Sequence, residues 1–156
     1  MATRKKLVTL TGTTDLTSGT FPIATTLGNL TDSAFTSTSL TSGTYTPTIT
    51  AEVNLDATTT VTQAQYSRVG ATVTVSGRFN ANPTTTATIT SFEISLPVAS
   101  NIGAVNDCAG VAFSGAIAGM GAEIIGVIAN DTAKIQWIAG DVAAQDWSYT
   151  FTYRVI

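Results

Sequence analysis

Apolar and polar residues alternate with a period of two along several stretches of this chain, most regularly at its C-terminal end. In the last ten residues, WSYTFTYRVI, every second residue from Trp147 is aromatic or aliphatic, and the residues between them are polar until Ile156. The stretch 71–79, ATVTVSGRF, shows the same pattern with smaller residues. A period of two is typical of a β-strand with one buried and one solvated face. Both stretches are therefore predicted to be strands.

Further stretches of this kind extend the prediction to about eight strands, over residues 45–53, 60–67, 71–79, 87–96, 107–114, 122–129, 132–139 and 147–156. No stretch combines a helix cap with a period of 3.6, and residues 115–125 could form one helical turn at most. Strands that recur every 8–12 residues or so are typical of sandwiches and jelly rolls. We predict an all-β fold, an antiparallel β-sandwich of jelly-roll-like organisation.

Three local signals refine this prediction. Arg68-Val69-Gly70 is expected to connect two strands as a hairpin, because glycine supplies the positive φ that tight hairpins often need. Pro47 lacks a backbone donor and indicates a sheet edge or the start of a strand. The alternation changes phase between Ile89 and Phe92, which predicts a bulge or bend.

The N-terminal 42 residues differ from the rest, because Thr, Ser and Gly dominate there and apolar residues stand alone. Only Lys6–Leu10 is predicted to form a short strand in this region. Isolated apolar residues bury little within one chain, so we predict an extended arm that needs a partner surface. A disordered tail is the alternative. The predicted organisation is an arm, 1–42, and one domain, 43–156.

The surface is expected to carry little charge, because only 11% of the residues are charged and the net charge is −3. Threonine occurs 31 times, 28 of them before Ser91, and its β-branched side chain favours strands. We therefore expect threonine hydroxyl groups, rather than charges, to keep the surface hydrated. The alternative interpretation of this composition is a glycosylated low-complexity stalk. Nucleic-acid binding is not expected, since it needs clustered Lys and Arg beyond Arg4, Lys5 and Lys6. No apolar run predicts a signal peptide or membrane insertion.

Residues that carry catalysis or bind metals are scarce. The chain contains no histidine, and its ten Asp and Glu residues are dispersed without a marked pair. Cys108, the only cysteine, is interpreted as a small buried apolar residue. We therefore predict a non-enzymatic protein without cofactor or metal. Tyr45, Trp137 and Trp147 could stack on a glycan, although aromatic residues in strands more often belong to a core or an interface.

Residues 104–138 contain a tract, AGVAFSGAIAGMGAEIIGVIA, that is apolar on both strand faces in places. A strand in a sandwich needs only one buried face, so leftover apolar faces indicate a second burial. A fully buried central strand is the alternative. Together with the low charge and the arm, the tract favours a homo-oligomer.

The segments GTYTPTIT, QYSRVGATVTVSGRF, ISLPVASNIGAVNDCAGVAFSG and FTYRVI, within residues 43–156, resemble a C-terminal β-domain of bacteriophage tail-fibre, head-fibre and other virion-surface proteins. The resemblance implies a homotrimeric tip on the virion surface, made in the host cytoplasm, whose N-terminal part docks to other virion proteins of the capsid or tail. Docking would then involve residues of the arm, which are Arg4, Lys5, Lys6, Leu16, Phe21 and Ile23.

This chain has no long shaft before the domain, which favours a short head fibre, a decoration protein or a compact tail-spike tip. The tip would serve host-surface adhesion or capsid decoration. One alternative is a carbohydrate-binding adhesin module that binds a host-surface glycan. A small polysaccharide depolymerase, which would need two placed carboxylates, is a further alternative.

Overall fold

The computed structural model describes residues 40–156, and this part of the chain is built from β-strands. In chain order the strands are β1 (Leu40–Tyr45), β2 (Ile49–Val53), β3 (Thr60–Val61), β4 (Ala64–Val69), β5 (Thr72–Ala81), β6 (Ile89–Ile94), β7 (Cys108–Ser114), β8 (Gly121–Val127), β9 (Thr132–Ile138) and β10 (Gln145–Arg154). A single 3-10 turn, η2 (Val105–Asp107), precedes β7. The all-β prediction is confirmed.

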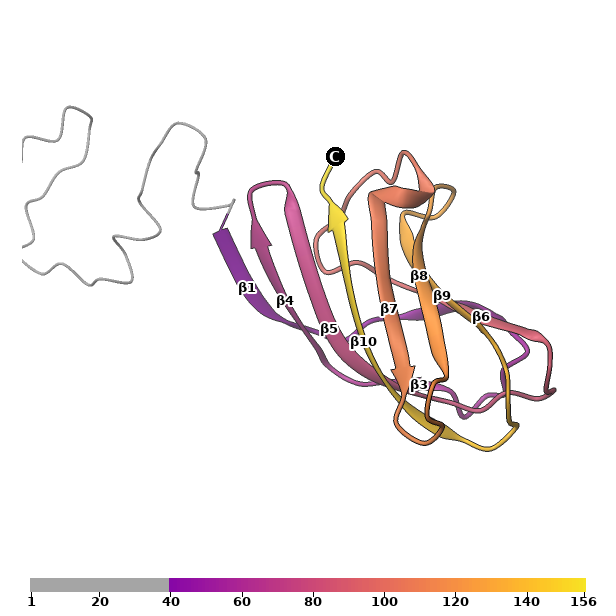
Figure 1. Ribbon diagram of the computed structural model, residues 1–156. Helices are drawn as coiled ribbons and strands as arrows, with labels where there is room; N and C mark the ends of the chain where they lie inside the picture. Colours follow the sequence, from indigo (N-terminus) through magenta and orange to yellow (C-terminus); the bar gives the residue numbers. More distant parts are fainter. Residues whose placement is uncertain (1–39) are drawn as a thin grey trace, which may run out of the picture.

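The strands form one antiparallel sheet in the order β1-β4-β5-β10-β7-β8-β9-β6-β2, and β3 pairs with β5 beside this path. The sheet curls into a half-barrel (Figure 1). Its two halves face each other across the core, because the ring of Phe79 in β5 lies 5.0 Å from that of Phe92 in β6 and 6.1 Å from that of Trp137 in β9. The division into two sheets that a sandwich implies is not confirmed for the described strands.

Strand β10 confirms the most regular of the sequence patterns. Its ten residues alternate between buried and exposed without interruption. Gln145 is the first buried residue, and it is followed by Trp147, Tyr149, Phe151 and Tyr153. The strand pairs with β5 on one side and β7 on the other. An aromatic residue at each inward position after Gln145 therefore places four large core side chains on a strand that is paired on both sides.

The predicted hairpin over 60–79 is also present, as β4 and β5. Arg68 and Val69, predicted to belong to the connection, are part of β4, and Val69 pairs with Thr72. The turn therefore consists of Gly70-Ala71 alone. Gly70 has φ +60°, a value that favours glycine over residues with a side chain.

The prediction of one strand over residues 45–53 is wrong. This stretch contributes the end of β1 and all of β2, which lie at opposite edges of the sheet. The chain leaves β1 at Tyr45, and Pro47, which cannot donate a ladder hydrogen bond, lies in the connection. Alternation continues across this connection, so the pattern alone does not show that the chain changes edge.

The irregularity predicted near Ile89 lies in the partner strand. Residues Ile89 to Ile94 of β6 pair with β9 without interruption. The register shifts instead where β6 pairs with β2, between Thr50 and Val53, and Ala51 has φ +51° there. The bulge therefore belongs to β2, an edge strand.

Two glycines inside the strands allow a close approach of the neighbouring strand. Gly77 pairs with Tyr149 and Gly110 with Phe151, both on the inward face of the sheet. A Cβ atom at Gly77 would lie 2.6 Å from Tyr149 Cζ, and one at Gly110 would lie 2.3 Å from Phe151 Cβ. Gly77 therefore makes room for the ring of Tyr149, whereas Gly110 makes room for the Cβ and backbone of β10.

Candidate functional site

The outer face of the sheet is divided into a hydroxylated half and an apolar part. On β1, β4, β5 and β10 most exposed outward residues have hydroxyl or amide side chains: Ser42, Thr44, Gln65, Ser67, Thr72, Thr74, Ser76, Ser148, Thr150 and Thr152. The others on these strands are Val69 and the charged Arg78, Asp146 and Arg154. Thr74 and Thr152 share a hydrogen bond of 3.2 Å across β5 and β10. Water can replace these contacts at little cost, so this half gives no sign of a partner of its own.

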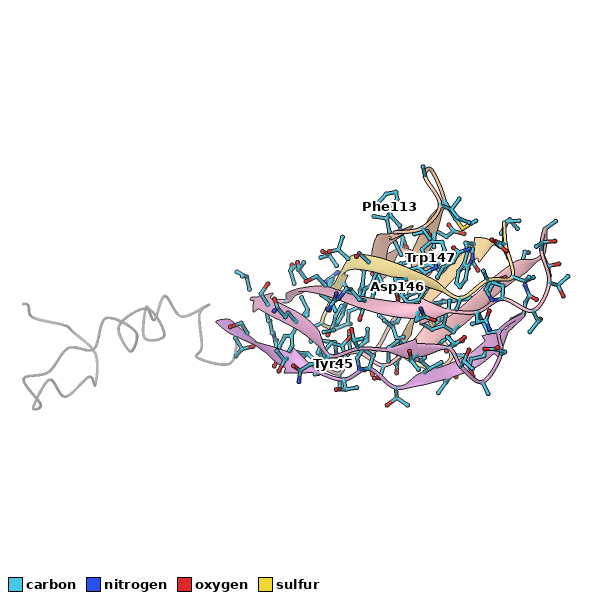
Figure 2. The ribbon with its side chains drawn as sticks, turned by 90° about the horizontal axis from the view of Figure 1, so that it is seen from below. Tyr45, Phe113, Asp146 and Trp147 are labelled. Carbon is cyan, nitrogen blue, oxygen red and sulfur yellow. The ribbon has the colours of Figure 1, made fainter. Side chains whose placement is uncertain are left out.

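The apolar patch comprises Ile89, Val111, Phe113 and Ile138, on β6, β7 and β9. Phe113 is 60% exposed, Ile89 59% and Ile138 58%. Figure 2 shows Phe113 projecting away from the strands. Such exposed side chains are ordinary when scattered but mark an interaction site when they are neighbours.

Strand pairing makes these residues neighbours. Ile89 is directly opposite Ile138. Phe113 is opposite Gly121, and its ring lies 3.5 Å from where a Cβ of Gly121 would be. Glu123 pairs with Gln136 two residues away, so the same register continued places Gly121 beside Ile138. The patch is therefore continuous across four strands, and Gly121, which has no side chain, lies between Phe113 and Ile138.

A shallow hollow of about 200 Å³ adjoins the patch and is lined by Ile89, Glu123, Gln136, Trp137 and Ile138. Glu123 accepts a hydrogen bond from the Gln136 side chain. This pair supplies the polar contact within an otherwise apolar surface, as in interfaces with an apolar centre and a few fixed polar groups.

The three aromatic residues predicted as glycan contacts do not form an exposed platform. Trp147 is 2% exposed and Trp137 is 6% exposed, and both lie in the core cluster. Their rings are 5.1 Å apart at an angle of 47°. Tyr45 is half-buried and lies edge-on to Tyr66, with 6.2 Å between the ring centroids. Burial leaves neither tryptophan a free ring face for a sugar.

The predicted docking residues, which are Arg4, Lys5, Lys6, Leu16, Phe21 and Ile23, lie outside the described residues. Sequence reasoning placed leftover apolar surface within 104–138, which includes Phe113 and Ile138. It missed Ile89, whose only signal was the change of phase before Phe92. That change puts Ile89 on the outer face while Phe92 points inward.

Buried titratable groups are held in their neutral forms. Burial raises the pKa of the Cys108 thiol to about 12, which makes it a poor nucleophile. Burial also raises the pKa of Tyr149 to about 12, and that of Tyr45 further still. The hydroxyls of Tyr45 and Tyr149 are buried without a hydrogen-bond partner. Their role is in packing, and they offer no proton donor to a solvent-exposed site.

Loops at the end of the sheet near β3 are fixed by side-chain hydrogen bonds. Asp56 accepts bonds from the Thr58 backbone and hydroxyl at 2.9 and 2.6 Å and another from the Asn82 amide. The Thr58 bonds lower the pKa of Asp56. Asn54, with φ +56°, donates to Thr90 Oγ1 at 2.7 Å. These loops therefore have a defined shape.

Within residues 40–156 no group of three or more His, Cys, Asp or Glu residues could hold a metal ion. The same part of the chain contains no helix long and apolar enough to cross a membrane. Comparison of the chain with protein-family models, with curated proteins and with solved structures finds no match. The resemblance to virion-surface β-domains stays a prediction from the residues that carry it.

Proposed function

We propose that this chain is a non-enzymatic structural protein of the bacteriophage virion surface, a short head fibre, decoration protein or tail-fibre-type tip that assembles as a homotrimer. The curled sheet, which begins with β1 at Leu40, is the tip, and the residues before it are the arm that docks it to the capsid or tail. The observation that carries the proposal is the apolar patch of Ile89, Val111, Phe113 and Ile138, which a chain of such low charge exposes on a regular sheet.

Burial of the patch between copies would stabilise an oligomer. A phenylalanine side chain offers about 200 Å², so the 60% of Phe113 that is exposed amounts to roughly 120 Å². At about 25 cal/mol per Å² its burial contributes about 3 kcal/mol per copy before the costs of association. Ile89 and Ile138 add comparable exposed fractions. The patch is therefore able to provide the apolar centre of an interface.

The direction of the chain supports display at a distance from an anchor. Leu40, where the arm joins the domain, pairs with Val69, and Val155 donates to the Ala71 carbonyl at the same end. The connections after β2, β5, β7 and β9 lie at the opposite end (Figure 1). A body that holds the arm would leave these loops facing outward, where they can contact a host surface.

The facing halves of the sheet support the sandwich interpretation of the tip, because their core side chains meet as the two layers of a sandwich do. The hydroxylated half of the outer face then hydrates the tip without strong charge. In a trimer three tips engage together, so weak single contacts with a surface combine into a stronger attachment.

Light scattering on the full chain tests the assembly, and reconstruction of the particle tests the location. We expect a mass three times that of the chain and density for the domain at threefold-related positions on the head or tail. A monomer at micromolar concentration would overturn the trimer, and a particle lacking the chain would overturn the virion role. Binding of the purified trimer to a glycan array would separate an adhesin from pure decoration.

A further inference from the structure

The described sheet has two edge strands, β1 and β2, and they differ in how far they are protected against pairing with another strand. Protein sheets protect their edges with bulges, prolines, charges and irregular backbone. Strand β2 has three such features: the register shift between Thr50 and Val53, the positive φ of Ala51, and the exposed Glu52. Its edge is therefore a poor template for an added strand.

Strand β1 has none of these protective features. All six of its residues pair with β4 in an unbroken register, from Leu40 with Val69 to Tyr45 with Ala64. Its sequence, LTSGTY, contains neither charge nor proline, and residues 41–44 are exposed. One side of this regular strand therefore presents backbone N–H and C=O groups that no described strand pairs with.

The inward face beside this edge is also incompletely covered. Tyr45 and Tyr66 are half-buried, whereas Tyr149 and Tyr153, nearer the centre of the sheet, are almost fully buried. Figure 2 shows Tyr45 close to the margin of the ribbon. An added strand with apolar residues would bury the remaining surface of these two rings as it completes the backbone ladder.

We propose that Lys6–Leu10 of a neighbouring copy adds to the free edge of β1 as a further strand. This inference rests on the oligomer proposed above. The segment reads KLVTL, which is the stretch of residues 1–39 that combines strand-forming residues in succession. Strand addition of this kind takes its affinity from main-chain hydrogen bonds and its selectivity from the alternate side chains.

The length of the connection favours a neighbour over the same chain. Residues 11–39 separate the segment from β1, a connection of 29 residues. Structureless loops longer than about 12–15 residues are uncommon inside compact domains. A chain rich in Gly, Ser and Thr has a root-mean-square span of about 30 Å at this length. Two domains of this size have centres roughly 35 Å apart, so the connection suits the span between copies.

Exchange of this segment around a ring gives the β1 edge of every copy a partner strand. Each copy provides one Lys6–Leu10 segment and one β1 edge, so a closed ring leaves neither unpaired. The exchange would also hold the arms together at the end of the domain where they start, since Leu40 begins β1.

Disulfide cross-linking between two variants tests the proposal. One chain carries Ser42→Cys, on the outer face of β1, and the other carries Leu7→Cys or Val8→Cys, which would point to opposite faces of the added strand. Cys108 is fully buried and does not compete. After mixed refolding and mild oxidation, we expect a linked pair of the two different chains with one of the two arm variants. Glu52→Cys on the β2 edge is the matched control and should give no link.

The results separate this inference from the proposed function. A trimer by light scattering without a mixed link overturns the strand addition and leaves the assembly standing. A link that forms only within one chain, in a protein carrying both cysteines, overturns exchange between copies. A monomer overturns both. As a second measurement, Val8→Pro should abolish the slow hydrogen exchange of the β1 amides that point to the free edge, whereas Thr13→Pro in the connection should preserve it. Equal exchange of these amides in both variants would also overturn the proposal.

Discussion

Gly77→Ala tests whether the packing of an aromatic ring over bare backbone stabilises the part of the sheet formed by β4, β5 and β10. Gly77 lies in β5, directly opposite Tyr149 of β10. A Cβ atom there would lie 2.6 Å from both Cζ and Oη of Tyr149 and 2.9 Å from the Cβ of Ala64. Real Cβ atoms do not approach other atoms so closely, so the buried ring must move.

The expected loss of stability follows from two opposing effects. Forcing an additional methyl group into a packed core costs about 1–3 kcal/mol. Replacing glycine by alanine inside a strand recovers about 0.5–1 kcal/mol, because the unfolded chain loses less freedom on folding. The net loss is therefore about 0–2.5 kcal/mol, with a midpoint of about 1 kcal/mol. Gly103→Ala, in the loop before η2 and outside the patch, is the control, because its new Cβ would meet its nearest atom, Asp107 Oδ2, at 3.4 Å.

Urea unfolding of both variants and the parent, at one protein concentration, measures the difference. We expect Gly103→Ala to unfold at the same or a slightly higher urea concentration than the parent, and Gly77→Ala to unfold earlier with an unchanged slope. Equal midpoints for the two variants would refute the packing explanation. Tyr149→Leu combined with Gly77→Ala should recover part of the loss, since the smaller side chain leaves room for the methyl group.

Three further outcomes are expected. Phe113→Ser should weaken self-association about a hundredfold or more by light scattering across a dilution series, whereas Val69→Ser, at an exposed position away from the patch, should not. Tyr153→Phe should cost about 1–3 kcal/mol in urea unfolding, because the Tyr153 hydroxyl donates to the Val98 carbonyl at 2.7 Å and accepts from its N–H at 3.0 Å; Tyr149→Phe, which loses no such bond, should be close to neutral. Burial raises the pKa of both tyrosines from 10 to about 12, so the unfolded chain ionises first and stability present below pH 10 should fall as the pH rises through 12. In a Tyr66→Phe variant, which removes the signal of the half-buried Tyr66, tyrosinate absorbance that appears near pH 10 without loss of the strand circular-dichroism signal would contradict that last expectation.

The sequence was sufficient to locate most strands, because a strand with one buried face must alternate. Residues 147–153 and 71–79 show this directly, since every apolar position predicted to face inward is buried apart from Ala71 and the half-buried Gly77. The order of strands in the sheet could not be predicted in the same way. The pairing of β6 with both β9 and β2, for example, joins residues far apart in the chain, and no local pattern encodes it.

The candidate site was only partly predictable. A surplus of apolar residues near Phe113 indicated a second buried surface, but which of them lie outside depends on register. Trp137 and Ile138 are adjacent in sequence, yet one lies in the core and the other in the patch. Ile89 joins the patch only because it pairs with Ile138, a contact between strands whose residues are 49 positions apart.

The position of β10 has a consequence for biosynthesis. Among the described strands, only β10 pairs with strands of two otherwise separate groups. One group contains β1, β3, β4 and β5, and the other contains β2, β6, β7, β8 and β9. Of the described strands, β10 is also the last to be synthesised. On the ribosome the earlier segments can pair within each group, but the two groups have no common ladder until β10 emerges. A message that ends before β10 is encoded should therefore yield two unjoined half-sheets with open edges, which are prone to aggregate, so that only chains that include β10 reach the assembly pool.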